Sequence, residues 1–326
     1  MPYPSWPRDQ LLRELSQADS LEALLRTYLE LNWLRPETAL WRTADALTIR
    51  ALGGSKFDFD LGCGDGLNSY ALAGGRLPLE VDCFIETTDV TPEVFFSGDV
   101  DIYDAPVQHS LSIPSPPHTI RTGLDHKAHL LERARGLRLY ENLVCHDANK
   151  SWPVPDASVT SLFSNVVYWL DDIETALAET ARVLRPEGSA VLLLPDPRFL
   201  ASSPARWATE RGWGWAEALD RGRAGHVKHV KSEGEWTSLF EAAGLKVTNH
   251  MTHLSHRLIE IHEVGLRPIS PVLIKMANKL SAVDRAEIKQ EWVEYCMALA
   301  LPMFTSGWLT DRSVPQTFHG FSLSRR

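Results

Sequence analysis

The sequence contains few cysteines, fewer basic than acidic residues, and no long apolar segment. Its four cysteines form no CxxC pair, which argues against a disulfide framework or a zinc ribbon and fits a reducing cytoplasm. The 33 Lys and Arg against 42 Asp and Glu give a net charge of −9, which argues against a surface that follows nucleic-acid phosphates. No apolar run approaches the ~20 residues that span a bilayer, and no secretory signal is visible. We therefore expect a cytoplasmic protein without a membrane span.

The N-terminal segment has the pattern of helices. Apolar side chains recur at helical spacing along residues 21–29, and Pro36 suits the first turn of a second helix. Trp33 and Trp41 are expected to be packing anchors within this segment. We interpret residues 1–54 as an N-terminal helical cap.

From residue 57 onward, strands and helices alternate. We expect strands at 57–61, 120–124, 141–146, 159–165 and 189–194, and helices at 67–73, 127–135 and 173–184. The last of these strands is a continuous apolar run, as in strands buried on both faces of a parallel sheet. Strands separated by helices of this length form βαβ units, so the predicted fold class is α/β with a doubly wound, mostly parallel sheet.

Other segments depart from this alternation. Residues 75–119 are predicted to be an insertion with some strand character, and residues 196–240 a helical lid segment. A strand is expected at 245–251, followed by one or two amphipathic helices within residues 268–304. After the cap, we therefore divide the chain into a core of residues 55–255 and a helical C-terminal extension with a final strand, residues 256–326.

A glycine-rich loop joins the first strand to the first helix of the core. It reads Asp60-Leu-Gly62-Cys63-Gly64-Asp-Gly66. Glycines let the backbone turn tightly and approach a ligand, which in a doubly wound sheet lies outside the carboxyl ends of the strands. The G-x-G-x-G spacing, with an acid two residues before the first glycine, resembles motif I of the class I S-adenosylmethionine-dependent methyltransferases.

Four further motifs, within residues 57–195, resemble the same family in the expected order. The resemblance implies a seven-stranded sheet in which Asp125, with its neighbour His126, binds the ribose, and Asp147-Ala148 binds the adenine. Residues 152–165 resemble the fourth strand beneath the methionine end, and residues 181–188 resemble the family's RVLRPGG turn. The implied cofactor-binding residues are Asp60, Gly62, Cys63, Gly64, Gly66, Asp125, His126, Asp147, Ala148 and Asn165.

The placement of the second-strand acid departs from the family pattern. Asp125 lies more than twice as far from Gly66 along the chain as Asp89 does, and Asp89 is closer to the usual spacing. Asp125, however, precedes a clear helix and is separated from Asp147 by the length that one βαβ unit requires, so we favour it. The acids also have plainer candidate roles: Asp60 could cap the loop, Asp125 could cap a helix, and Asp147 could form a surface turn.

Two residues after the fourth strand are the predicted catalytic residues. The family commonly places substrate-facing groups here, near the departing methyl, which implies roles for Asn165 and Tyr168. A packing role for Tyr168 remains open, and Trp169 is expected to be core.

Histidines are concentrated late in the chain, where six of the twelve lie between residues 226 and 262. No acid or cysteine lies at a convincing metal-ligand spacing from these histidines, and on a strand His253 would face away from His250 and His256. We therefore expect no metal site. One of these histidines could act as a general base, but the sequence does not select which. The basic stretch formed by Arg221, Arg223, Lys228 and Lys231 is either a solvated helix face or a pocket wall.

The resemblance implies that a methyl group passes from S-adenosylmethionine to an O, N or C atom of a small-molecule acceptor by in-line displacement, leaving S-adenosylhomocysteine. A glycan, a glycolipid precursor or a secondary metabolite is the expected acceptor. The alternatives are an RNA methyltransferase, which the net charge disfavours; an aminopropyltransferase; and a catalytically silent cofactor-binding or scaffold domain. The oligomeric state stays open, with a homodimer among the options.

Overall fold

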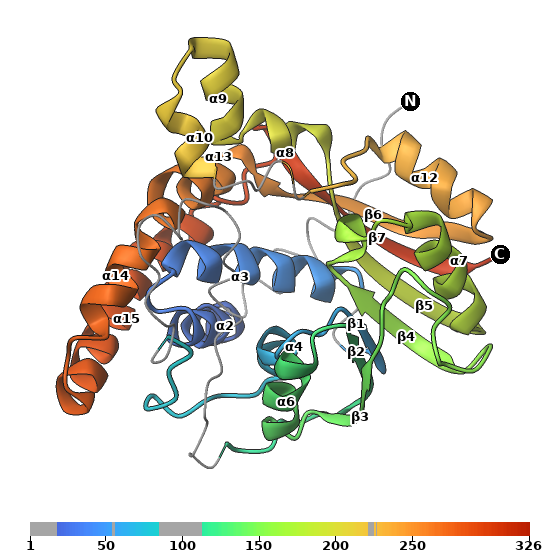
Figure 1. The fold of residues 1–326 in the computed structure, drawn as a ribbon, viewed down its shortest axis with the longest axis horizontal. Helices are drawn as coiled ribbons and strands as arrows, with labels where there is room; N and C mark the ends of the chain where they lie inside the picture. The colour runs from blue at the N-terminus through green and yellow to red at the C-terminus, as the bar shows by residue number, and fades with distance from the viewer. Residues whose placement is uncertain (1–17, 54–55, 85–112, 221–224, 226) are drawn as a thin grey trace.

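Helices flank one mixed β-sheet in the computed structural model, which describes residues 18–53, 56–84, 113–220, 225 and 227–326 (Figure 1). Most of the predicted insertion at 75–119, including Asp89, lies outside the described residues. The same holds for Arg221, Arg223 and His226.

The sheet has seven strands in the order β3-β2-β1-β4-β5-β7-β6. Their bounds are β1 (Phe59–Leu61), β2 (Ile120–Asp125), β3 (Tyr140–Cys145), β4 (Val159–Ser164), β5 (Leu184–Pro195), β6 (Leu245–Ser255) and β7 (Gln316–Arg325). Strands β1 to β5 are parallel, whereas β7 pairs antiparallel with both β5 and β6. This confirms the predicted doubly wound, mostly parallel sheet.

The register places the second-strand acid beside the glycine-rich loop. Leu61 pairs with Leu124, so Asp125 ends β2 where the chain leaves β1 for the loop. The placement of the second strand at residues 120–125 is therefore confirmed, although its distance from the loop in sequence is unusual.

Two predicted strands were too short. Strand β5 begins at Leu184 instead of residue 189, because Pro186 disfavours continuing α7 (Ile173–Val183) and the chain pairs at once with Val159. Strand β6 runs to Ser255 instead of residue 251, held by its antiparallel pairing with β7. This pairing partner is distant in sequence, at the end of the chain, so local periodicity did not show it.

The other helices surround the sheet and its carboxyl-terminal edge. They are α2 (Ala18–Leu31), α3 (Pro36–Ala51), α4 (Leu67–Leu72), α6 (Ala128–Gly136), α8 (Pro197–Ala201), α9 (Pro204–Arg211), α10 (Trp215–Asp220), α12 (Glu233–Ala242), α13 (His256–Glu260), α14 (Ser270–Ala277) and α15 (Ala282–Thr305), with the short turns η1 (Val167–Trp169), the π-helix η2 (Ile261–Leu266) and η3 (Arg267–Ile269). Figure 1 shows α3, α4 and α6 on one side of the sheet and α7 and α12 on the other. Among the described residues, no helix combines the length and apolarity needed to cross a bilayer.

Helix α3 packs closely against the sheet. A Cβ built on Gly320 of β7 would lie 2.8 Å from the side chains of both Leu52 and Thr48, so only glycine permits this approach. Trp33 and Trp41 are buried, as expected of packing anchors. These contacts connect the N-terminal helices directly to the core.

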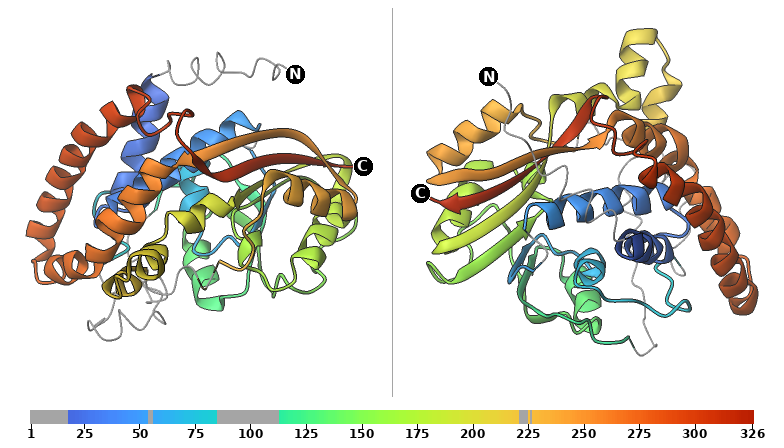
Figure 2. Two further views of the ribbon diagram at one scale, coloured as in Figure 1. Left: turned by 90° about the horizontal axis from the view of Figure 1, so that it is seen from above. Right: turned by 180° about the vertical axis from the view of Figure 1, so that it is seen from behind.

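The C-terminal helices lie at the end of the molecule farthest from the chain's C-terminus, as both views of Figure 2 show. A buried polar cluster ties α15 to the N-terminal segment: Arg285 Nε and Trp33 Nε1 each donate to Asp82 Oδ2 at 2.8 Å. Lys289 Nζ donates to the carbonyls of Leu79 and Val81. The extension is therefore anchored through charged groups as well as apolar contacts.

Candidate cofactor and acceptor site

The glycine-rich loop begins by pairing with the end of β2. The backbone N–H groups of Gly62 and Cys63 both donate to the carbonyl of Leu124, at 2.8 and 3.1 Å. Gly62, Gly64 and Gly66 have φ values of +78°, +56° and +76°, in the left-handed region that favours glycine. The loop conformation therefore depends on all three glycines.

The three glycines differ in what surrounds them. A Cβ on Gly62 would lie 2.1 Å from Val166, and one on Gly66 would lie 2.9 Å from the ring of Tyr140. Apart from its own chain neighbours, no atom of the described residues lies within 4 Å of the same position on Gly64. Gly62 and Gly66 thus serve internal packing, while the open side of Gly64 lets a ligand approach the backbone.

Asp125 fixes the loop from the end of β2. Its Oδ2 accepts from the Gly64 N–H, and its Oδ1 accepts from the Lys127 N–H, both at 2.9 Å. His126 is exposed, with Nδ1 3.6 Å from Asp125 Oδ1. A carboxylate has about four lone-pair sites, so Asp125 keeps acceptor capacity for two vicinal hydroxyls while it holds the loop.

Asp60 lies beneath the loop and is buried. Its Oδ2 accepts from Ser69 Oγ and from Tyr140 OH, each at 2.6 Å. The pKa of Asp60 is raised to about 6, mainly by burial; the two hydroxyl bonds oppose this rise and the charge of Asp125 adds to it. Asp60 therefore binds two hydroxyls that join α4 and β3 to the loop, instead of the backbone N–H groups that a loop cap would accept. Cys63 is also buried, and this burial raises the pKa of its thiol.

Asp147 forms a surface turn after β3. Its Oδ1 accepts from the backbone and side-chain N–H groups of Asn149, at 3.0 and 2.8 Å, and Lys150 Nζ lies 3.4 Å from Oδ2. These bonds lower the pKa of Asp147. The neighbouring Ala148 is buried, and its carbonyl accepts from Trp152 Nε1 at 3.1 Å. The turn geometry is compatible with the expected adenine contact, which stays a prediction.

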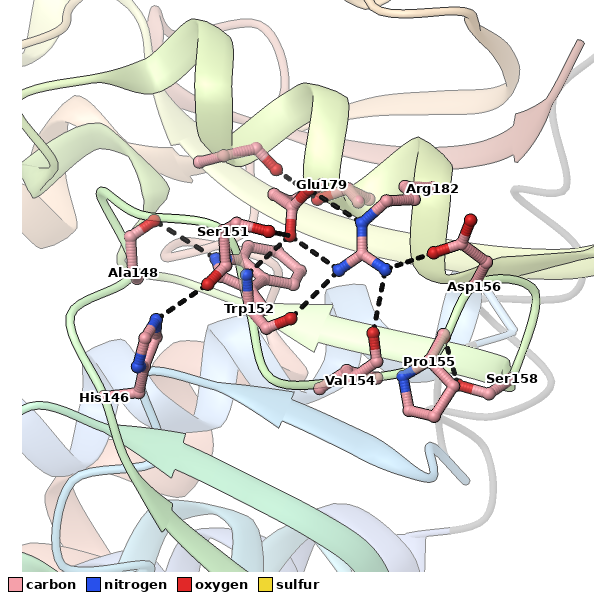
Figure 3. Close-up of polar contacts among 12 residues, drawn as sticks. His146, Ala148, Ser151, Trp152, Val154, Pro155, Asp156, Ser158, Glu179 and Arg182 are labelled. Carbon is pink, nitrogen blue, oxygen red and sulfur yellow. Dashed lines mark hydrogen bonds and ion pairs between the residues drawn. The ribbon is translucent and has the colours of Figure 1, made fainter.

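A charged network holds this turn against α7 (Figure 3). Glu179 accepts from the Trp152 N–H at 2.5 Å and from Arg182 Nη2 at 2.6 Å. Arg182 also donates to the carbonyls of Trp152 and Val154 and to Asp156. The bond to Arg182 lowers the pKa of Glu179. The sequence pattern showed Arg182 only as part of a turn motif, because its partners lie up to 30 residues away.

The predicted catalytic residues follow β4. Asn165 is half-buried, and Tyr168 is buried within η1 with its ring centroid 5.3 Å from that of Trp169. Trp169 is half-buried and packs against the core, where it was expected. The structure thus brings Asn165 and Tyr168 to the carboxyl end of β4.

Aromatic side chains from four elements meet beside Tyr168. Phe318 of β7 lies 5.9 Å from Tyr168 and 5.3 Å from both Trp41 of α3 and Phe199 of α8, measured between ring centroids. We call Trp41, Tyr168, Phe199 and Phe318 the aromatic cluster; all four are buried. The sequence indicated Tyr168 as a site residue and Trp41 as a packing anchor, but it did not indicate Phe199 or Phe318, which come from segments far apart in the chain.

The histidines fall on the two faces of β6 and on the helices after it. His250 and His319 bond to each other at 3.0 Å on one face, and His319 also bonds to Asp196 at 3.0 Å. His253 lies on the opposite face from His250, as predicted, and pairs with Asp45 of α3. Within the described ranges there is no group of three or more His, Cys, Asp or Glu side chains that could hold a metal ion.

The sequence of residues 116–192 matches the family described as "Methyltransferase domain". The match covers about a quarter of the chain and relates this segment to methyltransferase domains. The matched segment runs from just before β2 into β5 and includes Asp125, Asp147, Asn165 and Tyr168. S-adenosylmethionine is the cofactor of this class of transferase, and the open backbone at Gly64 and the spare acceptor capacity of Asp125 fit it.

Several solved structures resemble this chain. A Thermotoga maritima protein named as a candidate histamine N-methyltransferase is 14% identical, with 96% of this chain and 97% of that chain covered and a TM-score of 0.43. A candidate sarcosine dimethylglycine methyltransferase from Galdieria sulphuraria is 15% identical, with coverage of 89% and 85% and a TM-score of 0.43. A geranyl diphosphate methyltransferase in complex with S-adenosylmethionine is 13% identical, with coverage of 89% and 90% and a TM-score of 0.41. Similarities of this size carry no argument about the acceptor, and a search of curated proteins found no match.

Proposed function

We propose that this methyltransferase transfers a methyl group to a small-molecule acceptor that binds at the aromatic cluster. The observation that carries the proposal is the position of this cluster at the carboxyl-terminal edge of the sheet, directly after the segment that contains Asn165. In open α/β sheets ligands bind at this edge. Apolar and aromatic walls with a few polar groups are typical of sites that enclose small ligands.

The covering elements support an enclosed site. Trp41 comes from α3, Phe199 from α8 and Tyr168 from η1, and all three rings lie against Phe318 in the first residues of β7. An enclosed site excludes water, which suits methyl transfer because the reaction needs close alignment of acceptor and methyl group.

The charge of the chain supports a small acceptor over RNA. The net charge is −9, and the described part of the basic stretch is partly neutralised, since Lys228 forms an ion pair with Asp171. Binding to RNA would require clustered cations and would fall steeply with salt.

The residues have distinct proposed roles. S-adenosylmethionine supplies an electrophilic methyl group on a sulfonium. Gly64 admits the cofactor to the loop backbone, Asp125 accepts from the ribose hydroxyls, and the Asp147-Ala148 turn receives the adenine. Asn165 and Tyr168 lie after β4, where they would contact the methionine end and the acceptor.

The test is methyl transfer from labelled S-adenosylmethionine to a panel of phenols, alcohols, primary amines, carboxylic acids and a short structured RNA. We expect the wild type to methylate a small molecule and not the RNA. Tyr168→Phe should bind the cofactor with wild-type affinity but methylate the acceptor more slowly. The matched control is Tyr295→Phe, because Tyr295 is 69% exposed on α15 and far from the cluster. RNA methylation with steep salt dependence would contradict the proposal, and unchanged turnover in Tyr168→Phe would return Tyr168 to a packing role.

A further inference from the structure

A buried histidine–carboxylate pair lies where β6 ends. His253 Nε2 is 3.1 Å from Asp45 Oδ1, and the two residues are 5% and 3% exposed. If Nε2 carries the proton that bonds to Asp45, then Nδ1 carries a lone pair. That Nδ1 atom is buried and has no hydrogen-bond partner in the described part of the chain.

An unpartnered polar atom in a protein interior is rare and costs free energy, so it calls for a physical explanation. The position of His253 supplies one. Its ring contacts Phe318 of the aromatic cluster, with centroids 5.9 Å apart, and the two residues are partners in the β6–β7 register. The His253 ring therefore borders the aromatic cluster, and its unpartnered nitrogen lies next to the proposed acceptor site.

The backbone next to His253 is strained. Leu254 has a φ of +59°, which is unfavourable for a residue with a branched side chain, and its carbonyl accepts from Thr317 Oγ1 at 2.7 Å. Strain of this kind persists where the surroundings enforce it, often at functional sites. The π-helix η2 follows closely and places His262 against Trp41, with centroids 4.8 Å apart.

Neighbouring histidines have both ring nitrogens engaged. His250 lies between His319 and Glu233, His256 between Ser202 and Glu260, and His262 between Glu263 and Thr38. His319 bonds to His250 and Asp196. His253 differs from these histidines because its second ring nitrogen has no hydrogen-bond partner among the described residues.

We propose that His253 is the general base of this methyltransferase and removes the proton from an acceptor hydroxyl, with Asp45 as the residue that orients it. The inference rests on the proposed function. A hydroxyl is favoured over an ammonium because the aromatic cluster would have to bury a charge to hold the latter. An acid that fixes the tautomer of a histidine base is a recurring arrangement in enzymes.

The proton and electrons balance in one displacement. The acceptor oxygen forms a bond to the methyl carbon while the carbon–sulfur bond breaks, and its electron pair goes to sulfur. The hydroxyl proton moves to Nδ1 of His253, and the resulting imidazolium is held by Asp45. The proton leaves to solvent after the products depart.

The charged and titratable groups around the pair come from three elements. Arg42 of α3 also contacts Asp45, with Nη1 3.5 Å from Asp45 Oδ2. His250 of the same strand and His319 of β7 lie on the other face of the sheet, and His262 of η2 packs on Trp41.

The test compares His253→Gln and Asp45→Asn with His250→Gln, which removes a histidine from the same strand on the opposite face. Cofactor affinity is measured by calorimetry, and kcat is measured with an alcohol or phenol that the wild type methylates. We expect His253→Gln to lower kcat by about 10²–10⁴-fold with unchanged cofactor affinity. Asp45→Asn should lower kcat strongly too, and His250→Gln should stay within about twofold of wild type.

Histidine ¹⁵N spectra of the folded enzyme give a readout that needs no acceptor. We expect His253 to carry its proton on Nε2 and to lose this preference in Asp45→Asn. Protonation on Nδ1 in the wild type, unchanged kcat in His253→Gln, or a panel in which only amines are methylated would each overturn the inference. If the wild type does not bind S-adenosylmethionine in the calorimeter, that result would instead contradict the proposed function. If no panel member is methylated, the ¹⁵N result decides.

Discussion

Asp60 offers a quantitative test of how the glycine-rich loop is held. Its carboxyl is buried beneath the loop and accepts from Ser69 and Tyr140. The perturbation is Asp60→Asn, which keeps the shape and one acceptor oxygen for both hydroxyls but removes the charge. The free energy of unfolding of wild type and variant would then respond differently to pH.

The magnitude follows from the pKa. Burial raises the pKa of Asp60 from 3.8 to about 6 in the folded state. The folded protein therefore binds this proton more tightly than the unfolded chain, and the wild type loses stability as pH rises from about 4 to 6. A shift of about two pKa units corresponds to about 3 kcal/mol, at 1.36 kcal/mol per unit. Well above pH 6 the wild type has lost all of this stability, whereas Asp60→Asn has no carboxyl at this position and shows no such loss.

The assay is urea unfolding followed by tryptophan fluorescence between pH 4 and 7.5 at constant ionic strength. The free energy of unfolding of wild type minus that of Asp60→Asn should fall by about 3 kcal/mol over this range. In Tyr140→Phe the fall should move to higher pH, because the hydroxyl that lowers the pKa of Asp60 is lost. A difference that does not change with pH would refute this account of the loop.

Five further substitutions test the glycine-rich loop, the second-strand acid and the Arg182 network. Gly64→Ala should lower the free energy of unfolding by about 1–2 kcal/mol, because the backbone there is left-handed, and should weaken cofactor binding. Gly62→Ala should prevent folding, as measured by circular dichroism, because the added methyl would lie 2.1 Å from Val166. Asp125→Ala should weaken calorimetric S-adenosylmethionine binding by about 1–3 kcal/mol, and Asp89→Ala should not; equal losses would contradict the assignment. Arg182→Met should lower the free energy of unfolding in urea by about 1–3 kcal/mol, because it frees two backbone carbonyls and Glu179, and wild-type stability would count against the network.

The sequence predicted the parts of the fold that depend on local patterns. Alternating strands and helices, the loop glycines and the end of β2 at Asp125 all follow from residues close together in the chain. The extent of β6 did not, because its pairing with β7 joins two segments that are far apart in sequence. That longer strand is what places His253 on the sheet.

The candidate site was predictable in the same uneven way. Asp60, Asp125 and Asp147 were identified from motif positions, but their hydrogen-bond partners were not, since Tyr140 lies 80 residues from Asp60 and Gly64 lies 61 from Asp125. The choice among the histidines depended on Asp45, which is 208 residues from His253. Contacts of this kind are set by tertiary packing and leave no periodic signal.

The most direct test of the central claim is calorimetric titration of the purified protein with S-adenosylmethionine and S-adenosylhomocysteine, with NAD as a control. We expect binding of the first two with micromolar affinity and none of NAD, because Gly64 offers an open backbone and Asp125 a ribose acceptor at the end of β2. Tight binding of NAD, or no binding of either methyltransferase ligand, would contradict it.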